Sequence, residues 1–88
     1  MANHDSARKR IRQTQKRTER LRRIRSATRT YMKRLRAAIH KNDKQGAEAS
    51  LRQVISQIDR AVAKGVFHRR TGSRYIARLA SQVSQLGA

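Results

Sequence analysis

Apolar residues recur at helical spacing in three stretches of the chain. In the middle stretch they form one face, which comprises Leu51, Val54, Ile55, Ile58, Ala61 and Val62. The last stretch has a similar face, made up of Ile76, Leu79, Val83 and Leu86. In the first stretch a stripe begins only at Ile24 and continues through Thr28, Tyr31, Leu35, Ala38 and Ile39. The pattern predicts three helices that each have one apolar side.

Breaking and capping residues set the expected helix bounds. The first helix is expected from about Ser6 to Ile39 or His40, the second from about Lys44 to Ala63, and the third from about Arg69 to Leu86. The stretch "HKNDKQG" interrupts the first helix, with Asn42 or Asp43 as the N-cap of the second. Gly65 is suited to the left-handed conformation that ends a helix.

Short connections between these helices favour antiparallel neighbours. We therefore expect an all-α fold, an antiparallel three-helix bundle with an extended, basic N-terminal half of the first helix. Residues 1–22 would be the helical extension that penetrates RNA, and residues 23–88 the bundle. The core should be thin because Tyr31, Phe67 and Tyr75 are the only aromatic residues. The two tyrosines are assigned to core packing, and Phe67 to a plug between the second and third helices.

Positive charge dominates the composition. The 88 residues carry a formal net charge of +18, and the sequence pI is about 12.0. Residues 1–44 hold 16 basic and 3 acidic side chains, whereas residues 45–88 hold 7 and 2. This excess far exceeds what solubility requires and indicates a polyanionic partner that meets mainly the N-terminal half.

The basic residues of the N-terminal half are distributed around the first helix. Ten Lys or Arg residues lie from Arg8 to Arg25, with Glu19 as the single acid. At about 100° per residue they leave no gap wider than about 60°, which argues against a membrane surface or one flat partner. Like-charge pairs four residues apart also oppose a solvated helix. We expect this segment to lie between nucleic acid strands and to be helical mainly when phosphates neutralise it.

Further candidate RNA contacts are basic residues of the first helix and of the start of the third. They comprise Arg8, Lys16, Arg17, Arg20, Arg22, Arg23, Arg25, Arg29, Lys33, Arg34, Arg69 and Arg70. Hydroxyl groups are interspersed among the arginines, and some are expected to bond phosphate or sugar. They belong to Thr14, Thr18, Ser26, Thr28 and Thr30.

The remaining titratable residues give no catalytic or metal-binding pattern. The chain has no Cys, its five acids are scattered, and His4, His40 and His68 are far apart in sequence. We therefore expect no enzymatic activity, no metal and no cofactor. Asp59 is expected to pair with a basic residue of its own helical face.

Two stretches carry a family resemblance: the opening "MANHDSARKRIRQTQKRTERLRRIRSATRTYMKRL" and the later "DRAVAKGVFHRRTGSRYIARL". They resemble the bS20 family of bacterial small-subunit ribosomal proteins, and with the helix pattern the resemblance covers essentially the whole chain. It implies a three-helix bundle with a long first helix that binds small-subunit ribosomal RNA early in assembly. The resemblance assigns RNA contacts to Asn3, Ser6, Ala7, Lys9, Arg10, Arg12 and Gln13 in the first stretch, and to Lys64, Gly65, His68 and Arg74 in the second.

The resulting prediction is a noncatalytic, cytoplasmic protein of the small ribosomal subunit. It would bind small-subunit ribosomal RNA directly, stabilise its fold during assembly, and be a monomer outside the ribosome with no membrane or small-molecule partner. An alternative is a dimeric basic-region DNA-binding protein whose residues 24–39 form a zipper of about two heptads. A membrane-disrupting cationic helix is a third possibility, which the charge distribution opposes.

Overall fold

Three helices make up the computed structural model, which describes residues 2–87, with side chains from His4 to Gly87. They are α1 (Ala2–His40), α2 (Lys44–Ala63) and α3 (Arg69–Ser84), and the described residues contain no strand. The predicted all-α class is confirmed. The bounds of α2 agree with the prediction, whereas α1 begins earlier than Ser6 and α3 ends before Leu86.

Local capping interactions fix both connections between helices. Asp43 is the N-cap of α2, and its Oδ1 accepts a hydrogen bond from the Gly46 backbone N–H at 3.0 Å. After α2, Gly65 has a φ of 81°, in the left-handed region that glycine adopts without strain. His68 is the N-cap of α3, because its Nδ1 accepts a hydrogen bond from the Arg70 N–H at 3.1 Å. These caps explain why short connections suffice to reverse the chain twice.

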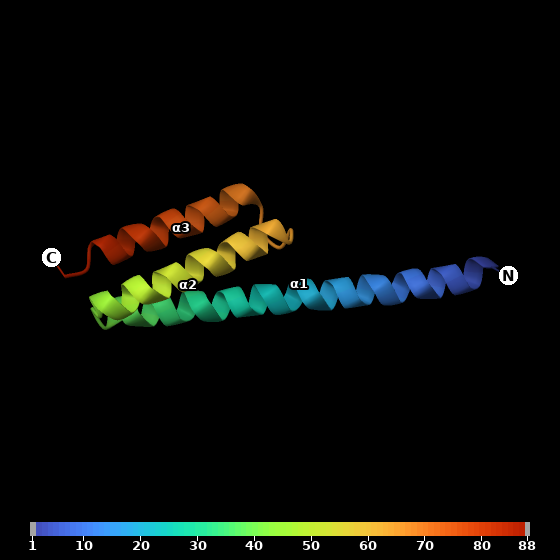
Figure 1. Ribbon diagram of the computed structural model, residues 1–88, viewed down its shortest axis with the longest axis horizontal. Helices are drawn as coiled ribbons and strands as arrows, with labels where there is room; N and C mark the ends of the chain where they lie inside the picture. The colour runs from blue at the N-terminus through green and yellow to red at the C-terminus, as the bar shows by residue number, and fades with distance from the viewer. Residues whose placement is uncertain (1, 88) are drawn as a thin grey trace.

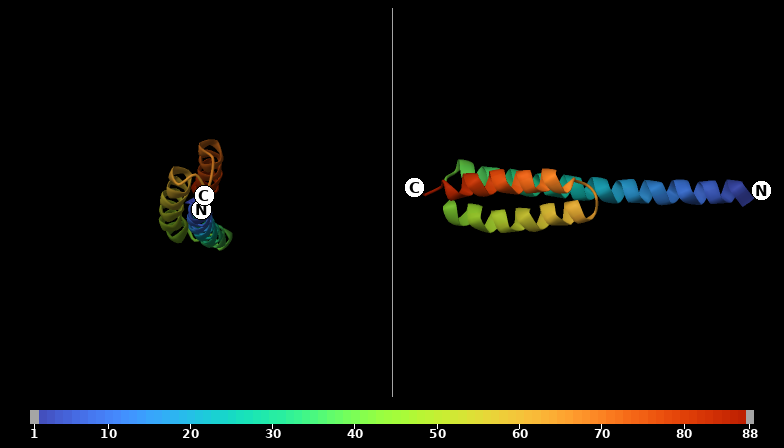
Figure 2. Two further views of the ribbon diagram at one scale, coloured as in Figure 1. Left: turned by 90° about the vertical axis from the view of Figure 1, so that its right-hand side faces the viewer. Right: turned by 90° about the horizontal axis from the view of Figure 1, so that it is seen from above.

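The helices run up, down and up, as expected for a bundle with short connections (Figure 1). α2 packs against both other helices, whereas α1 and α3 contact each other only slightly, as the end-on view suggests (Figure 2). The N-terminal half of α1 continues past the α2–α3 connection and gives the Cα trace extents of 69 × 21 × 14 Å. The bundle therefore supports a long arm that carries no neighbouring helix.

Aliphatic side chains from all three helices form the core. Leu35, Val54 and Ile58 are fully buried, and Leu79 and Val83 of α3 complete the same cluster. Ile55, which the periodicity assigned to the inner face of α2, is only half-buried. It lies beside the centre of that face, whereas Val54 and Ile58 occupy the centre. The core is correspondingly narrow.

The connection between α2 and α3 differs from the prediction in one respect. Val66, at 9% exposure, is its buried apolar residue, whereas Phe67 is half-buried. The ring of Phe67 meets that of Tyr75 edge to face, with centroids 5.8 Å apart, on the side of the bundle where α3 faces α1. Phe67 thus packs against α3 as a half-buried residue and not as a buried plug, and Val66 is the more deeply buried of the two.

The structure also excludes a zipper formed by residues 24–39. Thr28, Met32 and Leu35 are buried against the rest of the same chain, mainly α2, so they are not available to a second copy. The predicted alternative of a dimeric basic-region protein is wrong for this reason. Within residues 2–87, every helix is too short or too polar to cross a lipid bilayer.

Candidate nucleic-acid interface

The arm is the exposed N-terminal part of α1. Every side chain from position 4 to position 20 is exposed, and Leu21 is the first residue that the bundle half-buries. At the rise of an α-helix, this exposed stretch is about 25 Å long. It presents Arg8, Lys9, Arg10, Arg12, Lys16, Arg17 and Arg20 to solvent.

These cations have almost no acidic partner within the protein. Among the described side chains, the only salt bridge joins Arg23 Nη2 to Glu19 Oε1 at 3.0 Å, and both side chains are largely exposed. Asp59 forms no ion pair with any residue in positions 4–87, contrary to expectation. An exposed pair of this kind contributes little stability. The positive charge of the arm is therefore left for a partner to neutralise.

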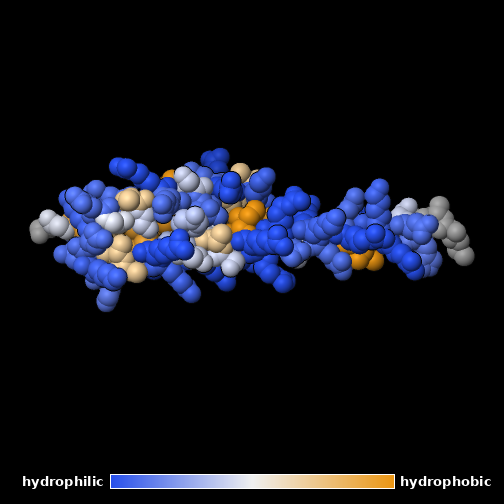
Figure 3. All heavy atoms as spheres, turned by 60° about the horizontal axis from the view of Figure 1, so that its bottom comes forward, coloured by the Kyte–Doolittle hydropathy of each residue, from blue (hydrophilic) through white to orange (hydrophobic). Residues whose placement is uncertain are grey.

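The charge on the arm covers a broad sector and leaves one uncharged face. Viewed down the helix axis, the arm's seven basic residues span about 200°. Arg22 and Arg25 fall in the remaining sector, but they lie beyond the arm, beside the bundle. The remaining sector holds Ala7, Ile11, Thr14, Gln15 and Thr18. Ile11 in this sector is 56% exposed. Figure 3 shows a hydrophobic patch within the otherwise hydrophilic surface of the arm. Charge on all sides, which the sequence suggested, holds for residues 8–25 together but not for the arm alone.

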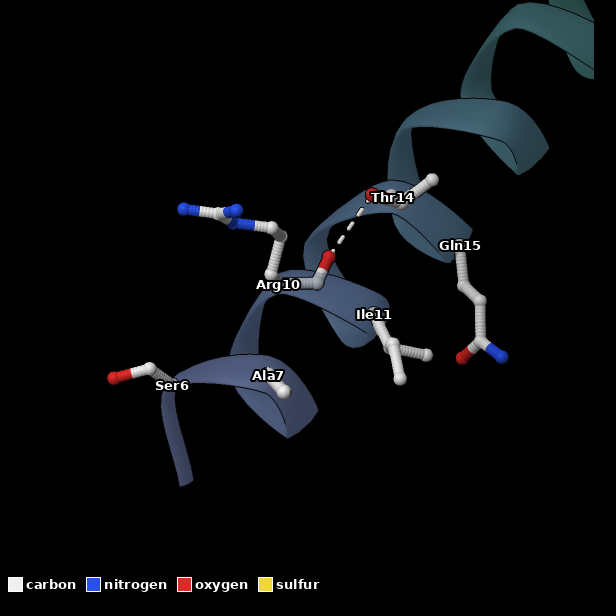
Figure 4. Close-up of a pocket in the computed structure, with 6 residues that line it drawn as sticks. All are labelled: Ser6, Ala7, Arg10, Ile11, Thr14 and Gln15. Carbon is white, nitrogen blue, oxygen red and sulfur yellow. Dashed lines mark hydrogen bonds between the residues drawn. The ribbon is translucent and has the colours of Figure 1, made fainter. Parts of the chain in front are cut away.

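Three threonine hydroxyl groups on α1 donate hydrogen bonds to the helix itself. Thr14 Oγ1 donates to the Arg10 carbonyl oxygen at 2.9 Å (Figure 4), and Thr30 Oγ1 donates to that of Ser26 at 3.1 Å. Thr28 is fully buried, and its Oγ1 donates to the Ile24 carbonyl oxygen at 2.8 Å. Thr28 is therefore a core residue, and its candidacy as a phosphate or sugar contact is wrong.

Lys64 is brought next to the base of the arm. It lines a hollow of about 340 Å³ together with Gln13, Lys16, Arg17, Arg20 and Leu21. Two sets of candidate residues that are far apart in sequence thus share one basic surface. The length of α2 could have revealed this, because an antiparallel helix of 20 residues starting near His40 returns to about residue 20 of α1.

The other candidate RNA contacts near the α2–α3 connection differ in how accessible they are to a ligand. Arg69, Arg70 and Arg74 are exposed at the start of α3, and the Arg74 guanidinium lies 5.7 Å from the centre of the Tyr75 ring. His68 is exposed, but its Nδ1 is engaged in capping α3, so it can offer only Nε2 to a ligand. Gly65 is exposed in the connection, where its backbone is open to close approach.

Further exposed cations continue along α1 beside the bundle. They are Arg22, Arg23, Arg25, Arg29, Lys33 and Arg34, and the guanidinium of Arg34 lies 5.6 Å from the centre of the Tyr31 ring. Arg36 was not among the candidates, although its spacing of seven from Arg29 places both on one face of α1. Asn3 lies within α1, but its side chain falls outside those described. Within positions 4–87, no three His, Asp or Glu side chains gather as a metal site requires.

Comparison with known proteins gives one consistent result. The family described as Ribosomal protein S20 matches residues 2–84. Small ribosomal subunit protein bS20 of Citrifermentans bemidjiense is 48% identical over 87 residues, which cover 99% of this chain and 100% of the relative. The protein of the same name from Geotalea uraniireducens is 51% identical, and the match covers 99% of this chain and 100% of the relative. The one from Xanthobacter autotrophicus is 43% identical, and the match covers 100% of this chain and 99% of the relative. These matches confirm the resemblance found in the sequence, and the chain belongs to the ribosomal protein S20 family.

Proposed function

We propose that this chain is a structural, noncatalytic protein of the small ribosomal subunit in the cytoplasm. It binds small-subunit ribosomal RNA directly and stabilises the folded RNA during assembly. Family membership supports the ribosomal role. The observation that carries direct RNA binding is the arm, whose seven basic side chains from Arg8 to Arg20 are all exposed and have one acid, Glu19, among them.

The arm acts by neutralising phosphates that belong to more than one RNA strand. Its basic sector spans about 200°, wider than a single groove or flat surface requires, so phosphates can approach it from two sides. The uncharged face around Ile11 meets sugar and base edges, because those are the parts of an RNA helix that carry no charge. Sequence readout is a minor part of such binding.

The bundle orients the arm and adds a second basic surface. Lys64 lies beside Arg17 and Arg20 at the base of the arm. Arg69, Arg70 and Arg74 lie in the first turns of α3, which begins at the end of the bundle where α2 ends (Figure 1). RNA that touches both surfaces is held at a fixed angle to the bundle. In this proposal residues 1–22 form the RNA-penetrating extension, residues 23–88 form the bundle, and the free protein is a monomer.

Chemical footprinting of small-subunit ribosomal RNA with the full chain tests this function. We expect the chain to protect backbone positions in a few RNA segments that lie close together in the folded subunit. A variant with Arg10→Gln, Arg12→Gln and Lys16→Gln should lose most of this protection. The control is Arg52→Gln, an exposed arginine of α2 that lies outside both basic surfaces. Equal loss of protection in the variant and the control would refute the role of the arm.

A further inference from the structure

A groove of about 310 Å³ lies where α1 faces α3, on the side that α2 leaves open. Arg29, Met32, Lys33 and Arg36 of α1 line one wall, and Phe67 and Tyr75 line the other. This volume lies near the lower limit of small-ligand pockets, which begins at about 300 Å³. Met32, with 7% of its surface exposed, is the buried apolar residue of the α1 wall.

The two walls of the groove differ in chemistry. Arg29, Lys33 and Arg36 are spaced four and three residues apart, all exposed, and thus project from one face of α1. The opposite wall is aromatic, with Phe67 and Tyr75 at a centroid distance of 5.8 Å and an interplanar angle of 87°. No acidic residue lines the groove. A row of cations therefore faces a pair of half-buried aromatic rings.

The ring surfaces of Phe67 and Tyr75 are not fully used by the core. Phe67 and Tyr75 are both half-buried, so each keeps part of its side chain open to solvent. Arg74 lies over the Tyr75 ring and adds a fourth cation next to the aromatic wall. A ligand that fills the groove can thus gain both stacking with an aromatic ring and charge neutralisation.

We propose that this groove binds one unpaired nucleotide of RNA, with its base against Phe67 and Tyr75 and its flanking phosphates on Arg29, Lys33 and Arg36. The proposal rests on the proposed function and adds a site that recognises unpaired RNA. Aromatic side chains stack on bases that have left a helix, whereas the bases within a duplex already stack on each other. A duplex could use the cations of the groove but not its aromatic wall.

Charge favours RNA over an apolar peptide as the occupant of the groove. Arg25 and Arg22 precede Arg29 by four and seven residues and thus share its face of α1, so further cations border the strand that fills the groove. An apolar peptide would gain nothing from Arg29, Lys33 and Arg36. An acidic peptide with an aromatic residue is the competing occupant, and the experiment below includes it.

Binding of short oligonucleotides to the full chain tests the groove. A short single-stranded oligoadenylate containing the fluorescent base 2-aminopurine is titrated with the protein, in parallel with a duplex of the same phosphate number and inorganic phosphate. We expect fluorescence quenching and tighter binding for the single strand. Phe67→Leu should weaken single-strand binding by about fivefold or more, the range that loss of one stacked base produces. Equal affinity for single strand and duplex would overturn the proposal.

Matched variants separate stacking from folding. Tyr31→Leu removes an aromatic ring that packs on the core outside the groove, and it should leave single-strand affinity unchanged. If Phe67→Leu fails to fold, the exposed pair Lys33→Gln and Arg36→Gln provides the test, and we expect it to weaken both quenching and affinity. Unchanged binding in either groove variant, or tighter binding of an acidic aromatic peptide, would overturn the proposal. If the groove variants still protect ribosomal RNA in footprinting, the proposed function stands whatever the groove binds. If the unmodified chain gives no footprint, the proposed function is refuted independently of the groove.

Discussion

Gln57 donates a hydrogen bond through Nε2 to Thr28 Oγ1 at 3.5 Å, while Thr28 donates to the Ile24 carbonyl oxygen within its own helix. This long hydrogen bond joins α1 to α2 at a fully buried polar side chain. Because it is long and Gln57 is half-buried, water can replace Thr28 as the partner of Gln57. The position depends on the shape of the threonine more than on its hydroxyl group.

Thr28→Val should therefore be nearly neutral. Valine has the same branched shape, so we expect the free energy of unfolding to change by less than about 1 kcal/mol. Thr28→Ala leaves a cavity in the interface between the helices and should cost about 1 to 2 kcal/mol. Chemical denaturation of both variants measures this. A loss above about 2 kcal/mol in Thr28→Val would show that the hydroxyl group is essential. RNA affinity should be unchanged in Thr28→Val, because the side chain is not accessible.

Gly72 sets the distance between α3 and α2. A Cβ atom added to Gly72 would lie 2.7 Å from Val62 Cγ2 and 3.2 Å from Ile58 Cγ2. Alanine gains about 0.5 to 1 kcal/mol over glycine within a helix, but overpacking of a core typically costs about 1 to 3 kcal/mol. We expect Gly72→Ala to lower the free energy of unfolding by up to about 2 kcal/mol.

A double-mutant cycle checks the cause of that loss. Val62→Ala removes the methyl group nearest to the added Cβ, so Gly72→Ala should be better tolerated in the Val62→Ala background. Thermal or denaturant unfolding of the four proteins gives the coupling energy. If the two substitutions change the free energy of unfolding in a strictly additive way, α2 and α3 do not meet at Gly72 and Val62.

The sequence predicted the helices because their end signals are local. Asp43 and Gly65 cap or end α2 through interactions within a few residues of themselves, and such signals can be recognised without a structure. The roles of Thr28 and Phe67 depend instead on which neighbouring helix covers them. Threonine suits both a core and a phosphate contact, and packing against α2 decides the case for Thr28. Val66 and Phe67 are both apolar, and the path of the chain after α2 buries Val66 more deeply than Phe67. The groove beside Arg36 joins α1 to α3 and has no local sequence signal.

The apolar core should determine stability, and the basic residues of the arm should not. Ile58 is fully buried, and Ile58→Ala should cost about 2 to 5 kcal/mol, enough to unfold much of a small domain. Ile55→Ala should cost less because Ile55 is only half-buried. Arg17→Ala removes an exposed charge from a repulsive surface and should leave the melting temperature unchanged or raise it. Equal destabilisation by Ile58→Ala and Arg17→Ala would contradict this division.

RNA affinity should depend strongly on salt. If about six to ten phosphates are neutralised, affinity should fall by several orders of magnitude between low and moderately high salt, because each contact releases condensed counterions. Arg12→Gln removes one exposed cation of the arm and should make the slope of log affinity against log salt shallower by about one contact. Arg52→Gln should leave the slope unchanged. A flat salt dependence in the unmodified chain would exclude phosphate neutralisation as the main source of affinity.

The arm of the free protein should be less stably helical than the rest of α1. Residues 4–20 bury no side chain, and Arg8, Arg12, Lys16 and Arg20 form a series of like charges four residues apart. From Leu21 onward α1 gains packing against the bundle, with Leu35 fully buried. Binding of RNA should stabilise the helical arm, because phosphates remove the repulsion and offset the entropic cost of ordering.

Residue-resolved hydrogen exchange measures this difference directly. In the free protein the amides of Arg10 to Arg20 should exchange quickly, whereas that of Leu35 should be protected by the packed helix. Addition of the RNA should slow exchange in the arm much more than in the bundle. Protection of Arg10 to Arg20 equal to that of Leu35 in the free protein would mean that the arm is a stable helix by itself. Phosphates would then bind a preformed helix, and no part of the binding free energy would be spent on ordering it.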